Sequence, residues 1–220
     1  DWLVDSASEI AHSLNVSELI IGLTVVAFGT SAPEFAVTIS AAFTGQTDIS
    51  IGNVIGSNIF NLGFILGGTA IIRPIVTSEK LFNRDGLFLL FTTALIFFLF
   101  FGFDGASPDD SFTIFEGMLL FSLLVGYIAF LFIKKDPPEE VHPHNANWKS
   151  YAYFFIGLFL IVYGGHLMVK HASIVAHAMG VSDWVIAVTI VAAGTSAPEF
   201  ATSISAALKG RHGIALGNLI

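Results

Sequence analysis

Residues 25–42 read VVAFGTSAPEFAVTISAA, and residues 190–207 read IVAAGTSAPEFATSISAA. The likeness extends outward from this pair. A shift of 165 residues aligns residues 1–55 with residues 166–220 without a gap and leaves 28 of the 55 positions identical. Shared membrane composition does not hold half of the residues in register over such a length, so the chain contains a duplicated unit.

The composition is that of a membrane protein. Hydrophobic residues make up 54% of the 220 residues and charged residues only 12%, which is about half the charged share of a soluble domain. The chain has no cysteine, which excludes disulfides and thiolate metal sites, and its net charge of −8 argues against a nucleic acid partner. Several apolar stretches approach the ~20 residues that an α-helix needs to cross a bilayer. The sequence therefore predicts an all-α integral membrane protein embedded in a lipid bilayer.

Apolar runs and helix breakers predict seven spans and the start of an eighth. Because the first and last are partial and the first residue is Asp1, we expect a fragment of a longer protein. A hydrophilic linker at 134–149 contains three prolines, which stop a helix, and separates a first membrane repeat at 1–133 from a second at 150–220. The predicted spans are 1–14, 18–44, 51–72, 85–103, 112–133, 149–179 and 183–208, with the eighth beginning at Gly213.

The distribution of basic residues predicts the orientation. Eight of the nine Lys and Arg residues lie in or beside the loops after predicted spans three, five and seven, and the opposite loops carry aspartates without Lys or Arg. Basic loops remain on the cytoplasmic side of a membrane. We therefore expect a multi-pass protein of the cell membrane whose loops after spans three, five and seven are cytoplasmic.

The number of spans between the two copies predicts an inverted repeat. The copy of span two is span seven, five crossings later, and an odd number of crossings makes the two copies enter the membrane in opposite directions. Inverted repeats are typical of secondary transporters, which hold their substrate near the middle of the membrane at the repeat interface. The fold class that we expect is thus an inverted-repeat secondary transporter.

Each copy places a carboxylate directly after a proline near the middle of a predicted span. Pro33 precedes Glu34, and Pro198 precedes Glu199. A proline inside a helix removes a backbone donor, and a membrane protein tolerates such a break where the freed carbonyls line a polar cavity. A carboxylate at that depth is costly and indicates a functional site. We therefore expect Glu34 and Glu199 to bind a transported cation.

The neighbouring side chains offer only oxygen as a ligand. Thr30 and Ser31 precede Glu34 by four and three residues, so they share a helix face with it, and Thr195 and Ser196 repeat the spacing in the second copy. Oxygen ligands suit Ca²⁺, Na⁺ or Mg²⁺ and not a soft metal. Predicted span three adds a polar stripe at steps of four residues: Asn53, Ser57 and Asn61.

The two motifs, GTSAPEFAVTIS with GNVIGSNIFN at 29–61 and GTSAPEFATSIS with GNLI at 194–220, resemble the α-repeats of the prokaryotic-type sodium/calcium exchanger family. This family belongs to the cation/calcium exchanger superfamily. The resemblance covers predicted spans one to three, six and seven. It implies ten spans in two inverted halves, of which about seven and a half lie in this chain, and oxygen-lined cation sites at the centre. It implies transported Ca²⁺ and Na⁺ and no cofactor.

The resemblance also implies roles for individual residues. Glu34 and Glu199 would bind Ca²⁺ directly, as well as Na⁺, and Ser57 and Asn61 match polar ligands of the third span. The second copy's counterparts of Ser57 and Asn61 would follow Ile220, so we expect the complete ion site to need residues beyond this chain. The implied sodium ligands are the hydroxyls of Thr30, Ser31, Thr195 and Ser196 and the carbonyls of Ala27 and Ala192.

These features favour a Na⁺/Ca²⁺ antiporter that works by alternating access. Two facing carboxylates without an ion are costly in a low dielectric, and one Ca²⁺ or about two to three Na⁺ would roughly cancel their charge. Occluded conformations are then accessible only with the site loaded, and exchange becomes obligatory. A Ca²⁺/H⁺ antiporter is the alternative within the superfamily, although its members usually carry Asn where Thr30 and Thr195 stand. In either case we expect protons to compete with the cations.

A cation channel with the two glutamates as its filter is an alternative of another class. Channel filters are usually built by rotational symmetry around a pore, and inverted repeats within one chain argue against this arrangement. We do not expect an enzyme, because no histidine shares a helix face with Ser31 or Ser196 to make a nucleophile and base pair. Nothing in the sequence identifies a protein partner.

Overall fold

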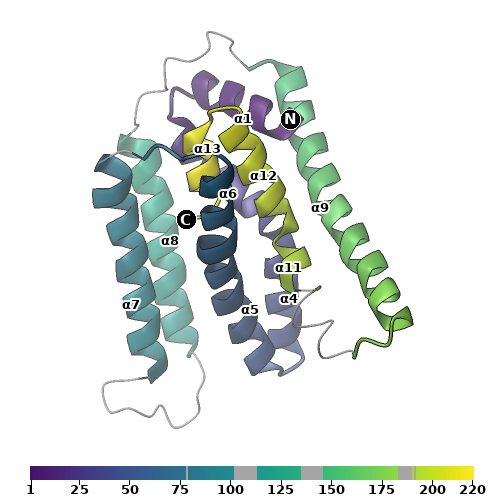
Figure 1. The fold of residues 1–220 in the computed structure, drawn as a ribbon. Helices are drawn as coiled ribbons and strands as arrows, with labels where there is room; N and C mark the ends of the chain where they lie inside the picture. Colours follow the sequence, from purple (N-terminus) through teal and green to yellow (C-terminus); the bar gives the residue numbers. More distant parts are fainter. Residues whose placement is uncertain (78, 102–112, 135–145, 183–189, 191) are drawn as a thin grey trace. The chain divides into compact units, whose positions relative to one another are not determined.

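The regular secondary structure in the described part of the chain is entirely helical. A computed structural model describes residues 1–77, 79–101, 113–134, 146–182, 190 and 192–220 (Figure 1). The helices form two compact units, Asp1–Ile75 with Pro137–Leu219 and, separately, Val76–Asp136. The first unit therefore combines helices from both copies of the repeat. The predicted all-α fold is confirmed.

Predicted span two is a broken helix. It bends by 53° between Glu18–Thr30 and Ala32–Phe43, at Ser31. Pro33 lies in the first turn after the break, where a helix tolerates a residue without a backbone donor, so a new helix begins there. The break follows from the proline, as expected. In chain order its segments are α2 (Glu18–Ile21), the π-helical η1 (Gly22–Val26), α3 (Ala27–Thr30) and α4 (Ala32–Phe43), and they follow α1 (Trp2–Ser13).

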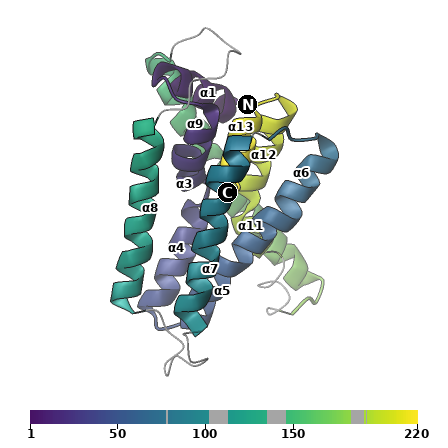
Figure 2. The same cartoon turned by 90° about the vertical axis from the view of Figure 1, so that its left-hand side faces the viewer.

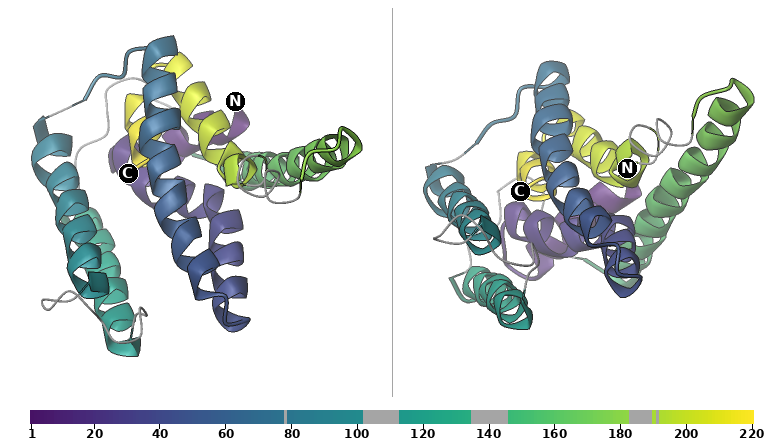
Figure 3. Two further views of the ribbon diagram at one scale, coloured as in Figure 1. Left: turned by 60° about the horizontal axis from the view of Figure 1, so that its bottom comes forward. Right: turned by 90° about the horizontal axis from the view of Figure 1, so that it is seen from below.

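Predicted span three is one long helix (Figure 3), and its middle segment is π-helical. Its three parts are α5 (Thr47–Phe60), η2 (Asn61–Leu66) and α6 (Gly67–Ile72). It starts four residues before the predicted boundary, and α4 packs against α5. Short π-helical segments inside α-helices are frequent at functional sites, and this one begins at Asn61.

The second copy begins with α9 (Trp148–Ala178), a helix of 31 residues that packs against α1. A glycine allows the close approach, because a Cβ added at Gly157 would lie 2.9 Å from the backbone nitrogen of Leu3. Trp2 stacks on Tyr153 beside it, with 5.5 Å between ring centroids. The remaining described helices of this copy are α11 (Ala192–Thr195), α12 (Ala197–Leu208) and α13 (His212–Gly217).

The turns show that the two copies share one local backbone fold. Asn15 and Gly180, which are 165 positions apart, both adopt a positive φ, at 55° and 78°. Gly45 and Gly210 do the same after the broken helices, at 71° and 74°. In all four turns the next amide donates to a carbonyl near the end of the preceding helix, which is a common helix C-terminal motif. The duplication is therefore one of structure as well as sequence.

The second compact unit contains two apolar helices. The π-helical η3 (Leu81–Gly86) leads into α7 (Leu87–Phe101), and α8 (Ile114–Lys134) follows (Figure 2). Phe88 stacks on Tyr127 with 3.9 Å between ring centroids, and the Tyr127 hydroxyl donates to the Asp85 carboxylate. These contacts join the two helices at one end.

Four described helices are long and apolar enough to cross a membrane, and the bent pair of span two makes a fifth. They correspond to predicted spans two to six. With 12 residues, α1 is shorter than a full crossing, and the eighth span is represented by the short α13. Residues 183–189 and 191 of predicted span seven, residues 135–145 of the predicted linker and residues 102–112 lie outside the described residues.

Candidate cation site

Hydrogen bonds cross between the two copies at the helix breaks. The Ser31 hydroxyl donates to Glu199 Oε1 at 2.7 Å, and the Ser196 hydroxyl donates to Glu34 Oε1 at 2.9 Å. Each serine is the N-cap residue of the helix that carries the glutamate of its own copy. The sequence indicated that Ser31 and Glu34 share a helix face, but each serine reaches the glutamate of the other copy. The 53° bend separates the two halves of span two at Ser31.

The glutamates are buried together. Glu199 is 0% exposed and Glu34 8% exposed, and each accepts a hydrogen bond from the serine at the helix break of the other copy. Each keeps one buried oxygen, Oε2, without a hydrogen-bond partner among the described residues. Buried carboxylate oxygens of this kind are costly unless a cation or a proton satisfies them. The two carboxylates therefore form a candidate cation site between the copies.

Asn61 contributes a third buried acceptor. It is the first residue of η2, which packs against α12, and its Oδ1 has no hydrogen-bond partner among the described residues. Ser57 lies one turn earlier, half-buried, and donates to the Val54 carbonyl of its own helix at 3.2 Å. Three helices thus supply the unpartnered oxygens. Buried polar groups in native proteins are normally satisfied, so these oxygens are candidates for binding an ion.

The other predicted ligands occupy equivalent places in the two copies. Ala27 and Ala192 are the first residues of α3 and α11, and Thr30 and Thr195 are the last. Thr30 is 0% exposed, and its hydroxyl has three acceptors within reach. These are Asn218 Oδ1 at 2.9 Å, the Val26 carbonyl at 3.1 Å and the Ala27 carbonyl at 3.2 Å.

Two asparagines support the glutamates, a role that sequence reasoning missed. The Asn53 side-chain amide donates to the Glu34 carbonyl at 3.0 Å, and the Asn218 amide donates to the Glu199 carbonyl at 3.1 Å. The sequence placed Asn53 in a polar stripe with Ser57 and Asn61, without assigning it a partner. The recurrence of this asparagine in GNVI and GNLI was the signal that could have identified it.

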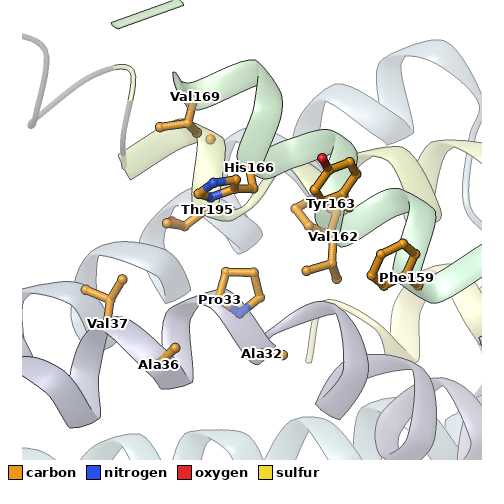
Figure 4. A pocket seen from close by; sticks show the side chains of 12 residues that line it. Ala32, Pro33, Ala36, Val37, Phe159, Val162, Tyr163, His166, Val169 and Thr195 are labelled. Carbon is orange, nitrogen blue, oxygen red and sulfur yellow. The ribbon is translucent and has the colours of Figure 1, made fainter. Parts of the chain in front are cut away.

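An apolar cavity of about 550 Å³ lies beside the helix breaks (Figure 4). Side chains of α4, α9, α11 and α12 form its walls, and they include both break prolines, Pro33 and Pro198. Figure 4 labels the His166 and Thr195 side chains among those that line the cavity. Neither glutamate lines the cavity, but Thr195, one of the predicted ligands, does.

Comparisons with known proteins agree with this arrangement. The family described as sodium/calcium exchanger protein matches residues 1–133 and 149–220. The putative antiporter CaxA of Alkalimonas amylolytica is 38% identical over 234 residues, covering 100% of this chain and 70% of that protein. Sodium/calcium exchanger MaX1 of Methanosarcina acetivorans is 34% identical over 266 residues, covering 100% of this chain and 73% of that protein. The solved structure of the exchanger NCX_Mj soaked with 2.5 mM Na⁺ and 0.1 mM Ca²⁺ superposes with a TM-score of 0.83 at 35% identity, covering 99% of this chain and 70% of that chain.

Proposed function

Because the chain belongs to the sodium/calcium exchanger family, we propose that it exchanges Na⁺ for Ca²⁺ across the cell membrane by alternating access. The observation that carries this proposal is the crossed pairing of serines and glutamates, which joins one carboxylate from each copy in a single buried site. Secondary transporters with inverted repeats hold their substrate at this interface. Ca²⁺ and Na⁺ are then transported ions and not cofactors.

The two carboxylates supply the charge that Ca²⁺ requires. Glu34 and Glu199 each offer an unpartnered Oε2 and bind Ca²⁺ and Na⁺. Ca²⁺ takes about six to eight oxygen ligands, more than two carboxylates provide, and Na⁺ also needs neutral oxygens. We assign the neutral ligands to the side chains of Thr30, Ser31, Ser57, Asn61, Thr195 and Ser196 and to the carbonyls of Ala27 and Ala192.

Charge neutralisation explains why exchange is coupled. Without an ion, two buried carboxylates are costly, although the hydroxyls of Ser31 and Ser196 donate hydrogen bonds to them. Bound Ca²⁺ or Na⁺ removes this cost, so closure over the site is favourable only when it is loaded. The crossed hydrogen bonds link the helix break of each copy to the glutamate of the other. A change in the backbone at one break therefore alters the hydrogen bond to the glutamate of the other copy.

The positions of the basic residues indicate on which side of the membrane the loops lie. Eight of nine Lys and Arg residues lie at the loops after predicted spans three, five and seven, which supports a cytoplasmic location for these loops, including 134–149.

Protons compete with the transported cations, because Glu34 and Glu199 can be neutralised by a proton as well as by a metal ion.

Calcium flux under imposed gradients tests the proposal. The full-length protein is reconstituted in liposomes, and Ca²⁺ uptake is followed with an outward Na⁺ gradient or, in sodium-free buffer, with a pH gradient. We expect the Na⁺ gradient alone to drive uptake. Uptake driven by the pH gradient without sodium would place the protein among the Ca²⁺/H⁺ antiporters. Uptake that needs no counter-ion, and follows only the Ca²⁺ gradient and the membrane potential, would indicate a channel.

A further inference from the structure

Asn218 is the buried side chain that joins the two copies beside the cation site. It is 3% exposed and lies directly after α13, which packs against α12. Its amide nitrogen donates to the Glu199 carbonyl at 3.1 Å and to the Ser203 hydroxyl at 2.9 Å, and its Oδ1 accepts from the Thr30 hydroxyl at 2.9 Å. Both amide hydrogens and the carbonyl oxygen are therefore engaged.

The amide hydrogen bonds of Asn218 have counterparts in the first copy. Asn53 donates to the Glu34 carbonyl at 3.0 Å and to the Thr38 hydroxyl at 2.9 Å. In both copies the asparagine bridges the glutamate carbonyl and a hydroxyl four residues later, that is, one turn of the helix that follows the break. This bridge restrains the turn that carries the carboxylate. Because the same two hydrogen bonds occur in both copies, we attribute them to the motif itself and not to chance packing.

The third hydrogen bond of Asn218 acts on Thr30, in the other copy. A hydroxyl has one proton and two lone pairs, so the Thr30 proton can serve only one acceptor at a time. The Asn218 oxygen, at 2.9 Å, is nearer than the carbonyls of Val26 and Ala27, at 3.1 and 3.2 Å. When the proton points to Asn218, the Thr30 lone pairs and the Ala27 carbonyl face no competing proton from this hydroxyl. Both oxygens are then available to a cation.

We propose that Asn218 is a positioning residue for sodium. It holds the Thr30 hydroxyl of one copy in a fixed orientation relative to the Glu199 turn of the other, so that a neutral oxygen and a carboxylate meet the same ion. This inference rests on the proposed function, in which Thr30 is a neutral ligand of Na⁺ and the two glutamates bind both Ca²⁺ and Na⁺. Removing the Asn218 side chain therefore weakens Na⁺ binding more than Ca²⁺ binding.

The first test is the Asn218→Ala variant of the full-length exchanger in proteoliposomes. The sodium concentration that half-saturates Na⁺-driven calcium flux should rise about tenfold, the effect of losing the one buried hydrogen bond that orients Thr30, while half-saturation by Ca²⁺ changes less than about twofold. Asn58→Ala is the matched control, because the exposed Asn58 amide donates to the Val54 carbonyl of its own helix at 2.8 Å. It should leave both concentrations unchanged.

A double-mutant cycle separates positioning from a general loss of structure. Thr30→Val removes the hydroxyl at nearly constant size, and adding Asn218→Ala to it should raise the half-saturating sodium concentration no further. Thr30→Val alone leaves both amide hydrogen bonds of Asn218 in place and should raise the half-saturating sodium concentration while that for Ca²⁺ stays nearly unchanged, so it provides the test should the alanine variant fail to fold.

Two outcomes would overturn the inference. Equal weakening of Na⁺ and Ca²⁺, or additive effects of Thr30→Val and Asn218→Ala, would show that Asn218 acts only through the Glu199 turn or through stability. Absence of sodium-driven flux in the unmodified exchanger would refute the proposed function and this inference together. A failure of the inference on Asn218 is thus seen in the variants, whereas a failure of the proposed function is seen in the unmodified exchanger.

Discussion

We predict that Arg211→Met strongly destabilises the protein. Arg211 precedes α13 in the second copy, and its guanidinium donates to Glu18 Oε1 at 2.8 Å, at the start of α2 in the first copy. The two side chains are only 10% and 6% exposed. The Ser8 hydroxyl of α1 donates to the same carboxylate. Three helices therefore meet at one buried charge.

The burial of the pair sets the size of the effect. Two unit charges about 4 Å apart attract by ~4 kcal/mol at an effective dielectric constant of about 20. Removing one partner of a buried pair costs ~3–5 kcal/mol, because the remaining charge stays uncompensated. Among the described residues, Arg211→Met would leave Glu18 with the Ser8 hydroxyl as its side-chain donor. A neighbouring pair provides the contrast. Lys209 contacts Asp5 at 2.6 Å, but these side chains are 28% and 52% exposed, and an exposed pair contributes at most ~1 kcal/mol.

The free energy of unfolding of the full-length protein, measured by denaturant titration in detergent micelles, tests this prediction. Arg211→Met should lose ~3–5 kcal/mol and Lys209→Met less than ~1 kcal/mol. The double variant Glu18→Leu with Arg211→Met should recover most of the loss, because it leaves no unpaired charge. Equal destabilisation by Arg211→Met and Lys209→Met would refute the reasoning, since it would mean that burial adds nothing to the strength of this pair.

Three further predictions concern transport and packing. Glu34→Gln and Glu199→Gln should each abolish uptake of ⁴⁵Ca²⁺ into Na⁺-loaded vesicles, because one buried carboxylate cannot neutralise Ca²⁺; uptake near the unmodified level in either variant would rule out the assignment. Shortening the linker at 134–149 should leave the calcium dependence of transport unchanged, because its acids lack the spaced ligands and central glycine of a calcium loop; a large shift in apparent affinity would contradict this. Gly157→Ala should lower the melting temperature, because its Cβ would lie 2.9 Å from the backbone of α1, whereas Gly164→Ala on the same helix meets open space and should not; similar melting temperatures for the two variants would argue against close packing of α1 on α9.

The amino-acid sequence by itself determined the class of the protein and the elements of its site. Apolar runs and the scarcity of charge predict spans, because transfer into a bilayer depends on local composition. The helix breaks were predictable from Pro33 and Pro198, since a missing backbone donor acts on its own helix. Glu34 and Glu199 were identifiable because a carboxylate inside a span is rare, and the duplication showed that the two belong together.

Only the tertiary structure decided which groups meet. The Ser31 hydroxyl bonds to Glu199, 168 positions away, and not to the glutamate on its own helix. Asn218 reaches Thr30 across 188 positions, and the pair of Arg211 with Glu18 is buried although both residues look like ordinary charges at helix ends. Helix periodicity relates residues three or four positions apart and carries no information on the register between helices of different copies. That register depends on the bend at each break and on how closely the helices pack, and both are properties of the folded chain.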